Sequence, residues 1–258
     1  MNHRVLVIEH EAEAGLGYFE DWLAGAGVTC DVVRPYLGEA VPEAAGDGLI
    51  VLGGAASAWD DEGFPWQPAT RDLLRASVEA SVPTLGVCLG AQLMTLACGG
   101  TVERGAPGLE VGLRPVTPLD AAARDPLFGV LPPVAWAVQY HGDAMTVPPP
   151  GAVPLATGDP YPAQGYRLGD RAWAVQFHPE ATPEIFTSWL ANPDPLTAAG
   201  YDPAALDAEV RGAAAGLAAT WRPFAEAFAA VVTRAEPLST PPAPLSINGD
   251  RAITARNH

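Results

Sequence analysis

Residues 86–90 read Gly-Val-Cys-Leu-Gly and place one cysteine, Cys88, between two glycines. This is the Gly-x-nucleophile-x-Gly form of a nucleophile elbow, with cysteine as the nucleophile. A sharp turn from a strand into a helix pushes the central side chain outward, and the glycines let the backbone pack closely around it. The sulfur then lies at a helix N-terminus, where free N–H groups favour the thiolate. The alternative is a buried structural cysteine in a glycine-bracketed turn.

A cysteine nucleophile needs a base, and often a third group that orients the base. The stretch 172–180, Ala-Trp-Ala-Val-Gln-Phe-His-Pro-Glu, offers both, because an apolar run ends at His178 and Glu180 follows two residues later. The carboxylate of Glu180 would hold one imidazole nitrogen while the other nitrogen faces the thiol of Cys88. A lone histidine at this place would be a turn residue, but the joint pattern predicts a catalytic triad.

A second histidine, His141, also follows an apolar run and is the alternative base. We see no carboxylate placed to orient it as Glu180 is placed for His178, so we expect the turn around His141 to be a pocket wall whose backbone groups bind an amino-acid head. This turn consists of Tyr140, His141, Gly142 and Asp143. His10 follows the first apolar run and is expected at the rim of the same site.

The remaining part of such a site would be an oxyanion hole, because attack on a carboxamide creates an oxyanion that backbone N–H groups must receive. Gly53 and Gly54 follow an apolar run and can aim an amide inward without a side chain in the way. The residue after the nucleophile, Leu89, would supply a second N–H. We predict an oxyanion hole formed by Gly54 and Leu89; the alternative for the double glycine is an ordinary turn.

Alternating strands and helices must position these groups. Short apolar runs predict buried strands at residues 4–8, 28–33, 49–52 and 82–87. Amphipathic runs predict helices at residues 14–24, 68–82 and 91–97. This alternation predicts an α/β protein with a mainly parallel central sheet and helices on both faces. Further runs predict antiparallel strands that extend the sheet, at residues 111–116, 134–140, 153–157, 164–168 and 172–177. Ligands of such sheets bind at the carboxyl ends of the parallel strands, where Cys88 and the double glycine lie.

The chain divides into three predicted parts. Residues 1–195 read as one domain, with a helix beginning at 183 near its end. Residues 196–236 predict a helical extension packed on this domain, whose Ala-rich helix at 203–235 is expected to be broken or kinked at Pro223. Residues 237–258 are Pro-rich and then polar, and they predict a flexible tail.

Composition limits the possible partners. The 258 residues carry a net charge of -16, which argues against nucleic acid or an anionic membrane. No apolar run approaches the ~20 residues of a membrane span, and the first residues do not resemble a signal peptide. Three cysteines, Cys30, Cys88 and Cys98, show no metal-ligand spacing. We therefore expect a cytoplasmic protein with reduced thiols, without a metal or a cofactor.

With these motifs the chain resembles the class I glutamine amidotransferases of the triad type, over residues 4–192. The resemblance rests on residues 86–92, 176–180 and 141–143 and on Gly53 and Gly54; residues 34–36, 110–112 and 165–167 are similar to the stand-alone, GMP-synthase-like members. It implies a flavodoxin-like fold and a cysteine, Cys88, that attacks the side-chain amide of glutamine. A γ-glutamyl thioester forms, ammonia leaves, and water releases glutamate.

The resemblance also implies a role for each site residue. His178 would be general base and then acid, Glu180 its orienting group, and Gly54 with Leu89 the oxyanion hole. Glutamine would be held by Gly53, Gln92, Tyr140, His141, Gly142 and Asp143. A separate synthetase would take the ammonia. The family usually has proline where this chain has Ala55, which predicts a less rigid oxyanion loop. Two alternatives stay open: a γ-glutamyl hydrolase or peptidase without a partner, and a non-catalytic protein on the same scaffold.

Overall fold

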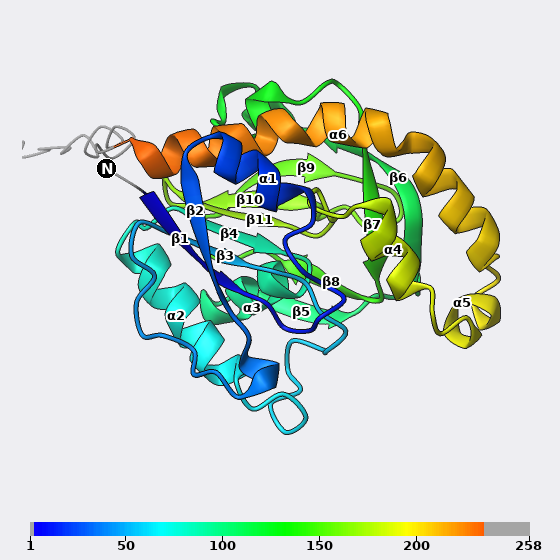
Figure 1. Ribbon diagram of the computed structural model, residues 1–258, viewed down its shortest axis with the longest axis horizontal. Coiled ribbons are helices and arrows are strands. Elements are labelled where there is room, and N and C mark those ends of the chain that lie inside the picture. Colours follow the sequence, from blue (N-terminus) through cyan, green and yellow to red (C-terminus); the bar gives the residue numbers. More distant parts are fainter. Residues whose placement is uncertain (1–2, 235–258) are drawn as a thin grey trace, which may run out of the picture.

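The computed structural model describes residues 3–234, and its centre is a nine-stranded sheet with the order β2-β1-β3-β4-β11-β10-β9-β6-β7 (Figure 1). The first five strands are parallel to one another: β2 (Val28–Val33), β1 (His3–Ile8), β3 (Gly48–Val51), β4 (Thr84–Val87) and β11 (Ala172–Val175). The other four continue the sheet in antiparallel pairing: β10 (Gly165–Leu168), β9 (Val153–Thr157), β6 (Glu110–Pro118) and β7 (Ala135–His141). The predicted α/β fold with an antiparallel extension is confirmed.

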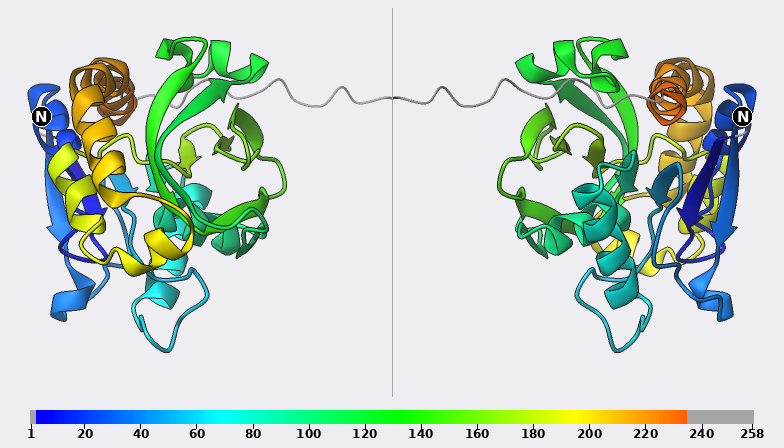
Figure 2. Two further views of the ribbon diagram at one scale, coloured as in Figure 1. Left: turned by 90° about the vertical axis from the view of Figure 1, so that its right-hand side faces the viewer. Right: turned by 90° about the vertical axis from the view of Figure 1, so that its left-hand side faces the viewer.

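Helices cover both faces of this sheet, as the end-on views of Figure 2 show. One face carries α1 (Tyr18–Gly25), α4 (Pro183–Trp189) and α6 (Pro203–Thr233), and the short α5 (Asp194–Ala198) precedes α6. The opposite face carries α2 (Gln67–Glu79) and α3 (Leu89–Ala97). Successive side chains of a strand point to opposite faces, so Val5 and Val7 enter one apolar core while Leu6 and Ile8 enter the other.

Two short strands that the sequence does not predict form a separate small sheet, β5 (Thr101–Arg104) with β8 (Asp143–Val147). Only Val102 is buried in β5, so this strand offers too little alternation of apolar and polar residues to be recognised. Three single 3-10 turns complete the described chain, at Pro35–Leu37, Asp120–Arg124 and Phe128–Val130.

Two helices differ from their predicted form. The first begins at Tyr18 and not at residue 14, because Gly17 has a positive φ of 49° that no helix continues. The last runs unbroken from Pro203 to Thr233, so a break at Pro223 is wrong, while the alternative prediction of a kink there stays a prediction. Pro223 lies between Trp221 and Phe224, whose buried rings pack the helix on the sheet. We infer that the free energy gained by burying these rings exceeds the cost of the backbone hydrogen bond that proline cannot form.

The predicted division into residues 1–195, 196–236 and 237–258 stays a prediction, and its last part lies outside the described residues. Across residues 3–234, every helix is too short or too polar to cross a bilayer.

Candidate active site

Cys88 occupies a strained turn between β4 and α3. Its φ of 49° and ψ of -105° are unusual for a residue with a side chain, and its N–H is held by the carbonyl oxygen of Val175 at 2.8 Å. Gly90 lies so close to β3 that an added Cβ would overlap the carbonyl oxygen of Val51. A Cβ on Gly86 would lie 2.8 Å from the backbone nitrogen of Ala91. Both glycines are therefore required by the turn that presents the thiol.

His178 lies beside Cys88 because β11 pairs directly with β4. A Cβ built on Gly53 would lie 2.8 Å from Cε1 of His178 and 3.5 Å from Cβ of Cys88, so the Gly53 backbone touches both side chains. Nδ1 of His178 lies 2.8 Å from Oε1 of Glu180, and both side chains are buried. Burial alone would lower the pKa of His178, but the negative charges of Glu180 and Cys88 outweigh it and raise this pKa to about 10.

An aromatic residue that sequence reasoning missed completes the surroundings of His178. The Trp189 ring lies 4.5 Å from the His178 ring, and its indole N–H donates to the carbonyl oxygen of Glu13 at 2.9 Å. Trp189 comes from α4, where an aromatic residue at helical spacing reads as part of the core. The His178 ring is thus held between a carboxylate and an aromatic face.

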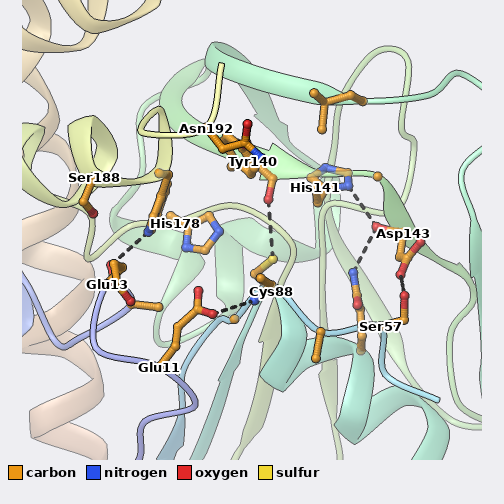
Figure 3. Close-up of a pocket in the computed structure, with 18 of the residues that line it drawn as sticks. Glu11, Glu13, Ser57, Cys88, Tyr140, His141, Asp143, His178, Ser188 and Asn192 are labelled. Carbon is orange, nitrogen blue, oxygen red and sulfur yellow. Dashed lines mark hydrogen bonds between the residues drawn. The ribbon is translucent and has the colours of Figure 1, made fainter. Parts of the chain in front are cut away.

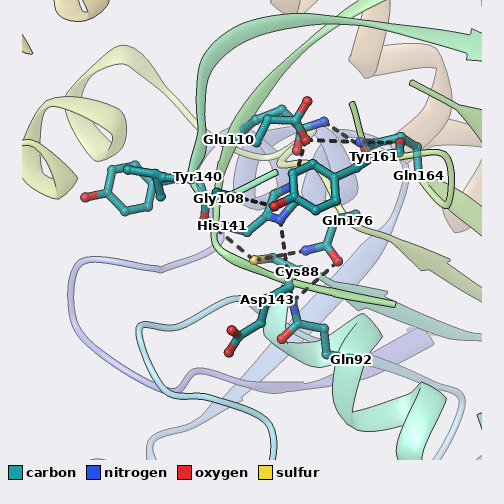
Figure 4. Close-up of polar contacts among 12 residues, drawn as sticks. Cys88, Gln92, Gly108, Glu110, Tyr140, His141, Asp143, Tyr161, Gln164 and Gln176 are labelled. Carbon is teal, nitrogen blue, oxygen red and sulfur yellow. Dashed lines mark hydrogen bonds and ion pairs between the residues drawn. The ribbon is translucent and has the colours of Figure 1, made fainter. Parts of the chain in front are cut away.

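His141 is engaged elsewhere, and the expectation that it has no carboxylate partner is wrong. Nε2 of His141 lies 2.8 Å from Oε2 of Glu110, and Nδ1 lies 2.9 Å from the carbonyl oxygen of Asp143 (Figure 4). The side chain of Gln164 donates to the same Glu110 oxygen at 3.2 Å. Because both ring nitrogens of His141 are occupied, the geometry favours His178 as the base. The pairing of Glu110 with His141 was not predicted because the two residues are 31 positions apart in the chain.

The double glycine lies against the start of α3. A Cβ on Gly54 would lie 3.1 Å from Cδ2 of Leu89 and 3.0 Å from Cβ of His10, so His10 is buried behind this turn and not at a rim. Within residues 3–234 the backbone N–H groups of Gly54 and Leu89 have no hydrogen-bond partner. The next N–H of the turn, that of Ala55, donates to a carboxylate oxygen of Glu11 at 3.2 Å.

A cavity of about 500 Å³ opens over Cys88 and His178 (Figure 3). The cavity wall includes the other predicted binding residues Gln92, Tyr140, His141, Gly142 and Asp143. The carbonyl oxygen of Tyr140 lies 4.0 Å from the sulfur of Cys88. The Gln92 amide donates to the carbonyl oxygen of Asp143 at 2.9 Å, and the Asp143 carboxylate accepts from Ser57 at 2.7 Å and pairs with Arg104 at 3.1 Å.

The predicted residues therefore converge on one place. Gly53, Leu89 and Glu180 form the layer directly behind the cavity, in contact with residues that line it. The fold brings them together from four strand ends, those of β3, β4, β7 and β11. A pocket with a strained cysteine, a buried His–carboxylate pair and free backbone N–H groups can support acyl transfer through a thioester.

Comparisons with known proteins point to one family. The chain is 31% identical over 186 residues to the glutamine amidotransferase-like protein YfeJ of Salmonella typhimurium, covering 70% of this chain and 77% of that one. It is 34% identical over 147 residues to a GMP synthase [glutamine-hydrolyzing] of Lactococcus lactis, covering 56% of this chain but only 26% of the synthase. The crystal structure of a glutamine amidotransferase from Thermotoga maritima superposes with a TM-score of 0.78 at 26% identity, covering 89% of this chain and 99% of that one.

The family model "Glutamine amidotransferase class-I" matches residues 20–193, about two thirds of the chain. The matched range contains Cys88, His178, Glu180 and the double glycine, whereas the cavity residues Glu11, Glu13 and Ala14 lie before it. The chain belongs to the class-I glutamine amidotransferase family.

Proposed function

We propose that this protein hydrolyses the side-chain amide of glutamine through a thioester on Cys88. The observation that carries the proposal is the arrangement at the ends of the paired strands β4 and β11. There the strained Cys88 lies beside His178, and Glu180 holds the far nitrogen of His178 at 2.8 Å. The raised pKa of His178 favours an imidazolium beside the Cys88 sulfur in the resting enzyme.

The first half of the reaction releases ammonia. The Cys88 thiolate attacks the amide carbon, and the electron pair of the carbonyl moves to oxygen, where the N–H groups of Gly54 and Leu89 receive it. The electron pair then returns, the carbon–nitrogen bond breaks, and the imidazolium of His178 donates its proton to the leaving nitrogen. The products of this half are ammonia and a γ-glutamyl thioester.

The second half regenerates the enzyme. His178, now neutral, takes a proton from a water molecule whose oxygen attacks the thioester carbon. The carbon–sulfur bond breaks, glutamate leaves, and the thiolate again faces an imidazolium. Throughout both halves Glu180 fixes Nδ1 of the ring and keeps Nε2 directed at the reacting atoms.

The residues opposite His178 would hold the amino-acid head of glutamine. The carboxylate of Asp143 suits the α-ammonium group, and backbone groups of the turn from Tyr140 to Gly142 suit the α-carboxylate. Gln92 supports this turn through the carbonyl oxygen of Asp143, and Gly53 leaves room beside Cys88.

We further propose that the ammonia serves a separate synthetase in the cytoplasm. The match to about a quarter of a GMP synthase supports a partner, since that relative is a longer protein named for hydrolysing glutamine. The three free thiols suit a reducing compartment. The alternative is a γ-glutamyl hydrolase that acts alone on larger amides. The cavity of about 500 Å³ has the ordinary size of a small-molecule site, so both substrates are compared in the test below.

A glutamine-like diazo-ketone tests the nucleophile. We expect it to alkylate Cys88 and to leave Cys30 and Cys98 unmodified, as peptide mapping would show. Cys88→Ala and His178→Ala should abolish release of glutamate from glutamine. Glu180→Gln should lower it by roughly 10–100-fold, because orientation is disturbed but proton transfer remains. His141→Ala serves as the comparison for the base.

Three results would contradict the proposal. An adduct on Cys98 would remove Cys88 from the mechanism. A loss of turnover in His141→Ala as complete as in His178→Ala, with glutamine still bound, would mean that the wrong histidine is the base. Faster release of glutamate from γ-glutamyl dipeptides than from glutamine would favour the self-sufficient hydrolase.

A further inference from the structure

Glu11 reaches into the cavity from the loop between β1 and α1, and nothing in the mechanism above uses it. One of its carboxylate oxygens accepts a hydrogen bond from the backbone N–H of Ala55 at 3.2 Å. Glu11 and Ala55 both line the cavity that contains Cys88 and His178, and Figure 3 shows the Glu11 side chain pointing toward them. The contact therefore lies at the oxyanion turn itself.

After Leu52, the residue that follows β3, the N–H of Ala55 is the first backbone N–H of this turn that makes a hydrogen bond. Leu52 donates to the carbonyl oxygen of Ile8 at 3.0 Å, and its own carbonyl oxygen accepts from Gly90. The N–H groups of Gly53 and Gly54, which follow, have no hydrogen-bond partner in the described part of the chain. Packing against His178 and Leu89 limits where the turn can lie, and the Ala55–Glu11 bond is the hydrogen bond available to orient its peptide planes.

The loop that carries Glu11 is itself anchored to the surroundings of the base. The carbonyl oxygen of Glu13 accepts from Trp189, whose ring lies on His178. The N–H of Tyr18, at the end of the loop, donates to the carbonyl oxygen of Glu180 at 2.9 Å. Glu11 thus connects the turn to the two elements that hold the general base.

We propose that Glu11 is a positioning residue that fixes the oxyanion turn through the N–H of Ala55. Proline has no N–H, so the contact requires a residue other than proline at position 55, which here is Ala55. The hydrogen bond does the work that a rigid ring would do: it holds the N–H of Gly54 toward the cavity before substrate arrives. The proposal rests on the proposed function only for its effect on turnover.

The charge on Glu11 makes this contact sensitive to pH. Burial raises the pKa of Glu11, and the negative charge of Glu13 raises it further. The hydrogen bond from Ala55 and the charge on His178 lower it. Together these effects leave the pKa of Glu11 above its ordinary value. An ionised carboxylate is the stronger acceptor, so the turn loosens as pH falls through this raised pKa.

A double-mutant cycle tests the proposal. Glu11→Ala should lower kcat for glutamine by roughly 10–100-fold with little change in KM, less than the ~10²–10³ expected when an oxyanion donor is removed outright. Glu11→Gln keeps a neutral acceptor and should lose less. In the Ala55→Pro background the N–H is gone, so Glu11→Ala should have no further effect. An equal loss in both backgrounds would overturn the proposal, because Glu11 would then act on something other than the turn.

A second measurement does not depend on turnover. In ¹⁵N-labelled protein the Ala55 amide should exchange slowly with solvent, lose this protection in Glu11→Ala, and shift as Glu11 titrates. Glu13→Gln removes a charge from the same loop without touching Ala55 and should leave the amide protected. If the amide responds but wild type releases no glutamate, the contact stands and the proposed function fails. If the amide ignores Glu11→Ala, the positioning role is wrong whatever the activity.

Discussion

Two histidines lie on either side of the oxyanion turn, which consists of Gly53, Gly54 and Ala55. The environment favours the cationic form of His178 and the neutral form of His10. Gly53 packs on His178, whose pKa is raised to about 10 against the effect of burial by Glu180 and Cys88. Gly54 packs on His10, whose burial lowers its pKa to about 4. Nδ1 of His10 accepts from the indole N–H of Trp66 at 2.9 Å, whereas its buried Nε2 has no partner among the described residues. His10 is therefore neutral and supports the turn by packing.

The lowered pKa of His10 makes the fold sensitive to acid. Between pH 6.5 and about 4, His10 is protonated in the unfolded chain but stays neutral in the folded chain. The free energy of unfolding therefore falls as pH falls. The full effect is on the order of 3 kcal/mol. His10→Asn keeps an acceptor for Trp66 but does not titrate. We expect its urea midpoint to fall less than that of wild type between pH 7 and 4.5, and equal slopes would contradict the assignment.

The residues that the sequence could predict are those whose partners lie nearby in the chain. Cys88 stands out by its flanking glycines, and His178 and Glu180 are two residues apart. Glu11 contacts Ala55, which is 44 positions away, and Glu110 contacts His141, which is 31 positions away. No local spacing in the sequence predicts such pairs. These contacts become visible only when the strand order of the sheet is known.

At the scale of elements, the elbow is the least tolerant connection. Gly90→Ala would press a Cβ into the carbonyl oxygen of Val51, and the β3–α3 contact must open to relieve it. We expect a loss of several kcal/mol in the free energy of unfolding, in the upper range for single substitutions. Gly212→Ala in α6 is the matched control, since nothing lies within 4 Å of the added Cβ.

The control substitution should raise stability by about 0.5–1 kcal/mol, because alanine is the better helix former. Chemical denaturation of both variants checks the pair. A mild effect of Gly90→Ala, comparable in size to that of Gly212→Ala, would show that the elbow adapts to a side chain.

The same distinction holds for elements as for residues. The buried strands could be predicted because continuous apolar runs such as those of β1 and β4 leave few other readings. The start of α1 could not, because its limit is the positive φ of Gly17, which packs against the carbonyl oxygen of Glu180 from a distant loop. The continuity of α6 through Pro223 depends on tertiary burial, which overrides the local preference of proline.

At the scale of the whole molecule, α6 closes one face of the sheet. It extends across the fold in Figure 1 and contacts α1, α4, β1, β6 and β7. Three buried aromatic residues on it, Trp221, Phe224 and Phe228, enter the core, and the indole N–H of Trp221 donates to the carbonyl oxygen of Trp136 at 2.9 Å. Without α6 this apolar face would meet water.

Trp221→Ala should therefore cost roughly 3–5 kcal/mol of stability, as large core truncations do. Glu226→Ala, at an exposed position of the same helix, should change it by less than about 0.5 kcal/mol. Thermal and urea unfolding compare the two variants. A chain that ends at residue 195 should aggregate; a soluble, cooperatively folding fragment of that length would instead show that the first 195 residues form an independent unit.

The position of β11 between β4 and β10 has a consequence for synthesis on the ribosome. Cys88 is translated 90 residues before His178, and the two meet only when β11 inserts beside β4. At about 5–20 residues per second, the thiol waits roughly 5–20 s for its histidine. The nascent chain therefore carries Cys88 without His178 beside it, and α6 covers the sheet only after nearly all of the described chain has emerged. The Cys88–His178 pair and the closed fold both form late in translation, so we expect the proposed activity to be absent while the chain is being made.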